Sequence, residues 1–271
     1  MNQLGYSAEE LARSPYARFF NPRMAPLPAH VLDALSKGCV ARELLPPASE
    51  ASRMQQPGYA TVENGYTVMA DGSARIACLT TMPRVTPAMW DWWFAWHGSE
   101  GLRYKLWHPL AHVDVAWADG RSDLANYVGR TSNIVEYVGS ACLKIRLRFV
   151  PPSELGYDES ALAARGEVAI CGRGGLAGLP FDAVWLVHHI RPVAGGAEMR
   201  SRFWIFGENV CLRAVPGGLG RAIGLAVAQT QRQSAVQAAE LLIHCAQEMN
   251  HLAAFLPDLY AEFGPASGRT T

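Results

Sequence analysis

The chain lacks the features that would place it in a membrane, on a nucleic acid or in a disulfide-bonded scaffold. Its 271 residues carry 24 Lys and Arg against 24 Asp and Glu, so a net charge of zero offers no field that would attract phosphate backbones. No apolar run approaches the roughly 20 residues that cross a bilayer, and the N-terminus lacks a basic patch followed by an apolar segment. We therefore expect a soluble, cytoplasmic protein with neither a nucleic-acid nor a membrane partner.

The six cysteines form no CxxC pair, and they predict neither a disulfide framework nor a zinc knuckle. We interpret them as reduced, mostly buried side chains. The hydrophobic content of 49% is enough for a sizeable core, which excludes disorder as the dominant state. Aromatic residues make up 10% of the chain, which suits a cavity for an aromatic ligand and equally suits a well-packed core.

The pattern of residues divides the chain into a helical, loop-rich N-terminal region, residues 1–62, and a larger domain, residues 63–271. Short strand-like segments predominate after Tyr66, and the clearest alternates apolar and basic residues over 143–149. A helix is expected from near Gly220 or Gln233 to about Leu256, with an apolar stripe that includes Val236. These segments predict an α+β fold in which a curved antiparallel sheet grips a long C-terminal helix and encloses a pocket.

A second helix is expected where Thr86-Pro87 supplies an N-cap and a first-turn proline, and it continues through His97. The tryptophans of this segment recur at helical spacing, which favours core packing over a ligand role. Two glycine clusters, residues 172–178 and 217–220, are interpreted as loops. The first is followed by Leu179-Pro180, where a dinucleotide site needs a helix. The glycine that follows the second comes one position too late for the GxGxxG spacing of such a site.

The strongest chemical signal is the pair His244 and Glu248, four residues apart on one face of the last helix. One divalent metal could bridge them, although a hydrogen-bonded pair on a solvated face gives the same spacing. Glu136 stands among aliphatic residues in a predicted strand, where a carboxylate is costly unless it is paired, protonated or bound to a cation.

Histidines supply the remaining candidates. His108 and His112 flank a proline, and the second opens a strand in which His112, Asp114 and Ala116 would share one face. The adjacent His188 and His189 would point to opposite faces of a strand, so one of them is expected to face the interior. One histidine of the 108/112 pair with Glu136, His244 and Glu248 would form a set that suits zinc or another transition metal, although spacing alone does not bring them together.

Four motifs carry a resemblance to a known family. Residues 91–97 (DWWFAWH), 103–109 (RYKLWHP) with His112, 200–204 (RSRFW) and the His244-x-x-x-Glu248 pair are similar in order and spacing to the 2,4-diacetylphloroglucinol hydrolase and phloretin hydrolase family. The resemblance implies a zinc-dependent hydrolase that cleaves the carbon-carbon bond between an acyl group and a phenolic ring. It also implies a small acyl-phenol substrate, a homodimer and a helix-grip fold like that of the birch-pollen allergen.

The resemblance also implies roles for individual residues. The Zn²⁺ ligands would be His112, with His108 as the alternative, together with Glu136, His244 and Glu248. Tyr104 would contact the substrate and act in catalysis with His188, and a strand registered one residue differently would bring His189 to the substrate instead. Phe203 and Val115 occupy substrate-contacting positions where the family has a tyrosine and a polar residue, so contacts to phenolic hydroxyls would be fewer.

Two other functions remain open from the sequence. One is a helix-grip protein that binds a small molecule without chemistry, which the phenylalanine at position 203 favours. The other is a polyketide-pathway metal enzyme that lacks carbon-carbon hydrolase activity. Retention of all four metal-type residues argues against the first, because a carrier gains nothing from buried carboxylates.

Overall fold

The computed structural model describes residues 3–122, 126–213, 215, 217–228 and 230–265. Its centre is an eight-stranded sheet of order β1-β2-β9-β8-β6-β5-β4-β3, in which each pairing is antiparallel. The strands are β1 (Gly65–Val68), β2 (Ala74–Pro83), β3 (His112–Trp117), β4 (Thr131–Val138), β5 (Ala141–Val150), β6 (Val168–Leu176), β8 (Val184–Val193) and β9 (Gly196–Ile205). Two short strands, β7 (Phe181–Asp182) and β10 (Cys211–Leu212), pair separately.

The helices lie at both ends of the chain and between strands. They are α1 (Ala8–Arg13), α2 (Ala29–Lys37), α3 (Pro87–Trp96), α4 (Gly101–Trp107), α5 (Glu159–Ala164), α6 (Gly217–Ala228), α7 (Ala235–Ala253) and α8 (Leu256–Phe263). Short 3₁₀ helices are η1 (Ala17–Phe19), η2 (Arg42–Leu44), η3 (Ala48–Gln55), η4 (His97–Ser99), η5 (Pro152–Leu155) and η6 (Gly207–Asn209). No helix within these described ranges is long and apolar enough to cross a membrane.

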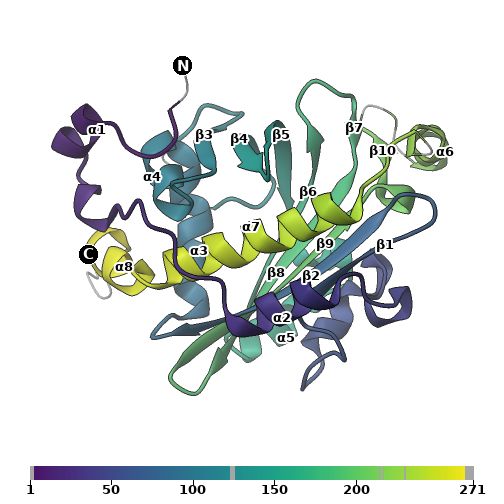
Figure 1. Ribbon diagram of the computed structural model, residues 1–271, viewed down its shortest axis with the longest axis horizontal. Helices are drawn as coiled ribbons and strands as arrows, with labels where there is room; N and C mark the ends of the chain where they lie inside the picture. The colour runs from purple at the N-terminus through teal and green to yellow at the C-terminus, as the bar shows by residue number, and fades with distance from the viewer. Residues whose placement is uncertain (1–2, 123–125, 214, 216, 229, 266–271) are drawn as a thin grey trace.

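The long helix α7 crosses one face of the sheet, as Figure 1 shows, and contacts β1, β2 and β4. Ser234 and Gln237 form a reciprocal capping box at its start, which fixes where the helix begins. Its sheet-facing side is fully buried and consists of Ala238, Leu242, Cys245, Met249 and Leu252. The predicted α+β fold, a sheet that grips a C-terminal helix, is therefore confirmed.

The N-terminal residues do not form a separate core. Tyr6, Tyr16 and Phe19 belong to the same hydrophobic cluster as α7 and the inner face of the sheet. A second cluster lies on the outer face, where η3 and η5 pack against strand residues such as Val187. The helices of the first 55 residues precede β1 at Gly65, so the proposed boundary at residue 62 falls in the connection between them.

Several local predictions need correction. The first glycine cluster is not a loop, because β6 continues through Leu176. A Cβ on Gly174 would come within 2.6 Å of the Arg146 carbonyl oxygen, so the missing side chain lets β5 and β6 approach closely. The second cluster belongs to α6, which begins at Gly217 and is separate from α7, and Val236 is exposed rather than part of the apolar stripe.

Two smaller expectations also differ from the structure. Thr86 precedes α3 as expected, but its side chain makes no capping hydrogen bond. Only Cys78, Cys171 and Cys245 are buried, whereas Cys39 and Cys142 are exposed, and all of these thiols are free. Sequence patterns do not indicate which cysteines lie in the core, because small side chains occur both in the core and on the surface.

Candidate metal centre

A β-bulge at the start of β3 determines where His112 points. His112 pairs with Glu136 and Asp114 pairs with Val135, so two steps along β3 correspond to one along β4. This extra residue resets the alternation of side chains. His112 is consequently buried while Asp114 is exposed, and the predicted shared face of His112, Asp114 and Ala116 is wrong.

The bulge and α7 bring four side chains to one point. The Nε2 atom of His112 lies 3.7 Å from Glu136 Oε2 and 3.3 Å from Glu248 Oε2. The Nε2 atom of His244 lies 3.9 Å and 3.7 Å from the same two oxygens. Donor atoms of His112, Glu136 and His244 all lie within 4.8 Å of one another. The strands and the helix α7 therefore converge, which the spacing of these residues in the sequence could not establish.

Hydrogen bonds behind the site orient its imidazoles. His112 Nδ1 donates to the Tyr104 carbonyl oxygen over 3.0 Å, so Nε2 carries the lone pair and has no hydrogen-bond partner among the described residues. His244 is hydrogen-bonded to the backbone of Tyr137. Such backbone partners are typical of metal-binding histidines. His108 stacks on the His244 ring, with centroids 5.0 Å apart, and lies outside the convergent group.

The electrostatics of the site favour a bound cation. Burial raises the pKa of Glu136 to about 7, although the hydrogen bond from Tyr104 opposes this shift. Burial and the neighbouring Glu136 raise the pKa of Glu248, and burial lowers the pKa of His244 to about 4. Two neutral imidazoles face two carboxyl groups whose charge is unstable without a counter-ion. The 3.3–3.9 Å separations are close to the roughly 3.4 Å between ligands of a tetrahedral zinc ion, so the residues fit such an ion.

The convergent group opens onto a cavity of about 410 Å³ between the sheet and α7. Glu136, His244, Glu248 and Tyr104 line it directly, and its remaining walls are mainly apolar side chains from β4, β5, β8 and β9. A few polar groups on an apolar wall are typical of small-molecule sites. The cavity is therefore suited to a small, largely apolar ligand that presents one polar group to the four side chains.

Comparison with known proteins identifies the family. The family model described as "DAPG hydrolase PhiG domain" matches residues 44–261. The chain belongs to this family. It is 31% identical to a 2,4-diacetylphloroglucinol hydrolase from Pseudomonas sp, over 92% of this chain and 88% of that protein. It is 33% identical to the phloretin hydrolase of Eubacterium ramulus, over 94% of this chain and 92% of that protein.

A third relative and a solved structure are also similar to this chain. The 2,4-diacetylphloroglucinol hydrolase of Pseudomonas protegens is 30% identical over 92% of this chain and 85% of its own length. The crystal structure of Ara h 8.0201 is 11% identical, covers 67% of this chain and 99% of its own, and has a TM-score of 0.34. The resemblance drawn from the sequence motifs is confirmed by the family match.

In this DAPG hydrolase family member, the two adjacent histidines of β8 have different surroundings. His188 lines the cavity, and its Nδ1 lies 2.8 Å from Ser201 Oγ. Burial lowers the pKa of His188 to about 3, so the ring is neutral at neutral pH. His189 points to the opposite face, where it lies 3.0 Å from Glu167. The expected substrate contact at His189 is therefore wrong for this cavity, because successive strand residues face opposite sides.

The two positions at which the chain departs from the family pattern also have different surroundings. Phe203 lines the cavity and packs edge-on against His188. Val115 is buried in the hydrophobic core and does not line the cavity, so the expected substrate contact there is not supported by its position. Tyr104 stacks on the His112 ring at 3.7 Å and donates its hydroxyl hydrogen to Glu136.

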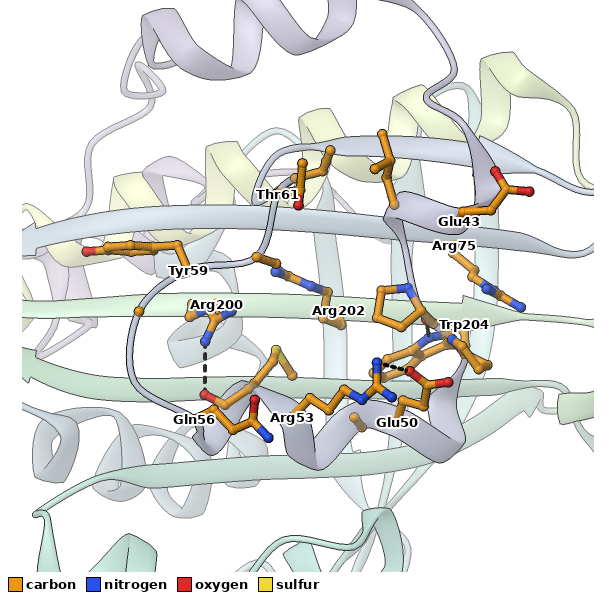
Figure 2. Close-up of a pocket in the computed structure, with 18 of the residues that line it drawn as sticks. Glu43, Glu50, Arg53, Gln56, Tyr59, Thr61, Arg75, Arg200, Arg202 and Trp204 are labelled. Atoms are coloured by element: carbon orange, nitrogen blue, oxygen red, sulfur yellow. Dashed lines mark hydrogen bonds and ion pairs between the residues drawn. The ribbon is translucent and has the colours of Figure 1, made fainter.

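A second pocket, of about 570 Å³, lies on the outer face of the sheet beneath residues 42–62 (Figure 2). Arg200 and Arg202 on its floor share the carboxylate of Glu63, and Arg53 pairs with Glu50. No histidine or cysteine is among the described residues that line it. Its charges serve to hold the N-terminal segment on the sheet, so the inner cavity is the better candidate for chemistry.

Proposed function

We propose that this protein is a zinc-dependent hydrolase that cleaves the carbon-carbon bond between an acyl group and a phenolic ring. The observation that carries the proposal is the convergence of His112, Glu136, His244 and Glu248 beside a largely apolar cavity, which the last three of them line. The names of the relatives, which specify 2,4-diacetylphloroglucinol and phloretin, support an acyl phenol as the substrate.

The reaction adds water across the bond, so that an acyl phenol yields a carboxylic acid and a deacylated phenol. The bond breaks heterolytically when the ring adopts a keto tautomer, because the ring carbon then leaves as a stabilised carbanion and takes up a proton. Zinc, held by the two histidines and two glutamates, would supply Lewis acidity and lower the pKa of water from about 16 toward 7. The protein must therefore orient the acyl carbonyl and move protons.

Two cavity residues are suited to these tasks. His188 is neutral and buried, so its imidazole can take a proton from a hydroxyl or water and return it to the ring carbon. The Tyr104 hydroxyl is held by Glu136 at the edge of the convergent group, where it can orient a substrate oxygen. Burial and Glu136 raise its pKa, so Tyr104 remains a hydrogen-bond donor rather than a phenolate.

The experiment that tests the proposal is product analysis. Zinc-loaded protein would be incubated with 2,4-diacetylphloroglucinol and, separately, phloretin, and the products resolved by mass spectrometry. Equimolar carboxylic acid and deacylated phenol are expected, and His188→Gln should form both far more slowly while retaining zinc. Zinc-loaded protein that binds both compounds and cleaves neither would favour a binding protein.

We also infer that the protein is a cytoplasmic homodimer. Sedimentation velocity would test whether it forms a dimer.

A further inference from the structure

His97 presents an unused hydrogen-bond acceptor to the inner end of the cavity. It follows α3, is 3% exposed and lines the cavity beside Phe94 and Trp107. Its Nδ1 lies 2.8 Å from the Trp93 carbonyl oxygen, and because a carbonyl only accepts, Nδ1 must carry the hydrogen. Burial lowers the pKa of His97 to about 4, so Nε2 keeps its lone pair at neutral pH. Within the described chain, no hydrogen bond reaches that Nε2 atom.

Ser132 presents a second unused polar group at the same end. It is 2% exposed, lines the cavity, and its hydroxyl has no partner among the described residues. Ser132 pairs in register with Trp117, against which Gly98, the neighbour of His97, packs closely. The His97 segment and Ser132 therefore flank one end of the cavity. A buried hydroxyl without a partner costs stability unless a ligand satisfies it.

The end of the cavity beside Ser132 is separated from the metal centre along β4. Ser132 and Glu136 are four residues apart on the same face of β4, which corresponds to about 13 Å along the strand. Phe149 lies two residues beyond Leu147, the β5 partner of Ser132, and Phe94 packs on both Phe149 and Trp107, so these aromatic rings wall the inner end. Leu143 is the β5 partner of Glu136 and lines the cavity at the other end. An aromatic ring therefore suits the inner end, and an aliphatic chain suits the outer one.

We propose that His97 and Ser132 form a phenol-binding subsite that receives the ring hydroxyls of an acyl phenol. The ring lies at the aromatic end, the acyl carbonyl meets the convergent group, and the acyl chain extends along the aliphatic walls. The His97 Nε2 accepts a hydrogen bond from one ring hydroxyl, and Ser132 bonds to another. This assignment rests on the proposed function, and it supplies hydroxyl contacts that Phe203, which lines the same cavity, cannot make.

The test measures binding without turnover. The probes are 4-hexylresorcinol, which has no acyl bond to cleave, and its dimethyl ether, which cannot donate a hydrogen bond. In zinc-loaded wild-type protein, titration calorimetry should find the ether bound about tenfold or more weakly. Ser132→Ala and His97→Asn should each reduce this discrimination, because each removes the partner of one of the two hydroxyls. Asparagine at position 97 retains a donor to the Trp93 carbonyl. His97→Gln restores an acceptor near the Nε2 position and should recover much of the discrimination between the phenol and its ether.

The outcomes separate the subsite from the proposed reaction. Discrimination that is unchanged in Ser132→Ala and His97→Asn, with wild-type zinc content and melting temperature, would overturn the subsite even if acyl phenols are cleaved. Discrimination reduced in both variants supports the subsite, even if no acyl phenol is cleaved and the hydrolase proposal fails. Ser132→Ala removes a single oxygen, so it keeps the test decisive if His97→Asn does not fold.

Discussion

His112 on β3 stands opposite Glu136 on β4, and the bulge that follows His112 resets the alternation of β3, so that His112 is buried beside Glu136, which lines the cavity. Helix α7 then supplies His244 and Glu248 from the other side. The four groups come from two consecutive strands and from a helix far along the chain from both. Burial of these polar groups costs free energy unless they share a partner. A cation shared by these groups, as proposed above, would satisfy them.

Removing one carboxylate or one imidazole should therefore abolish metal binding. Glu136→Ala and His244→Ala are each expected to weaken zinc binding by at least about 100-fold, because each removes a direct donor from the set. Elemental analysis of identically purified proteins would check this, with near-stoichiometric zinc expected in the wild type. Glu240→Ala, one turn before His244 on α7, is the matched control and should retain its zinc. Full zinc content in Glu136→Ala would contradict the assignment.

Zinc affinity should depend on pH through Glu136 and Glu248, because the pKa values of both carboxyl groups are raised. The Glu136 pKa of about 7 means that a proton occupies its carboxyl group below neutrality, and zinc must displace that proton. Affinity is therefore expected to fall as the pH decreases through 7, by about tenfold per unit for each proton displaced. The histidines do not compete in this range, because burial lowers the pKa of both His112 and His244. Chelator competition between about pH 5.5 and 8.5 would measure the curve.

Tyr104→Phe provides the check on this explanation. The Tyr104 hydroxyl donates to Glu136 and lowers its pKa, so its removal should raise the pKa of Glu136 further. The zinc-affinity curve is then expected to shift to higher pH, with little change at its alkaline end. Superimposable curves for wild type and Tyr104→Phe would show that Glu136 is not the group that sets the pH dependence.

The sequence predicted the composition of the site but not its geometry. The motifs around His112 and the His244 to Glu248 spacing identified the metal-type residues, since both are local patterns. The β-bulge was not predictable, because nothing in the residues after His112 distinguishes it from regular alternation. Whether His188 or His189 faces the cavity depended on strand register, which only the pairing of β8 with β9 decides.

Polar residues in apolar settings were the hardest to interpret. His97 ends an aromatic helix and Ser132 lies in an ordinary strand, so neither carries a pattern that indicates a cavity. The glycines of β6 were wrongly predicted to form a loop, because glycine is more frequent in turns than in strands. Close approach of the neighbouring strand accounts for Gly174, and such long-range packing leaves no trace in a single sequence.

His188 should affect turnover without affecting metal content. His188→Gln is expected to lower kcat by about 100- to 10,000-fold, the range for loss of a positioned acid or base. Ser201→Ala removes the partner of the His188 Nδ1 and should have a smaller effect, because the imidazole remains but loses its orientation. Steady-state kinetics with an acyl phenol, together with zinc analysis, would check both. Equal kcat values in His188→Gln and wild type would exclude His188 from proton transfer.

The buried charges under the N-terminal segment are expected to control stability rather than activity. Glu63 bonds to both Arg200 and Arg202 on the outer face of β9, and the two arginines outweigh burial and hold the pKa of Glu63 below its usual value. Glu63→Ala would leave two buried guanidinium groups without their counter-ion, at a cost of about 3–5 kcal/mol in the free energy of unfolding.

Denaturant unfolding would measure this loss, with Glu43→Ala as the control. Within the described residues Glu43 pairs with the exposed Arg42, so its removal should leave the free energy of unfolding nearly unchanged. Because the pKa of Glu63 is lowered by folding, its contribution should be complete above its usual pKa and disappear as the pH falls through the lowered value. A wild-type advantage over Glu63→Ala that persists unchanged into strong acid would show that packing, not charge, holds residues 42–62 on the sheet.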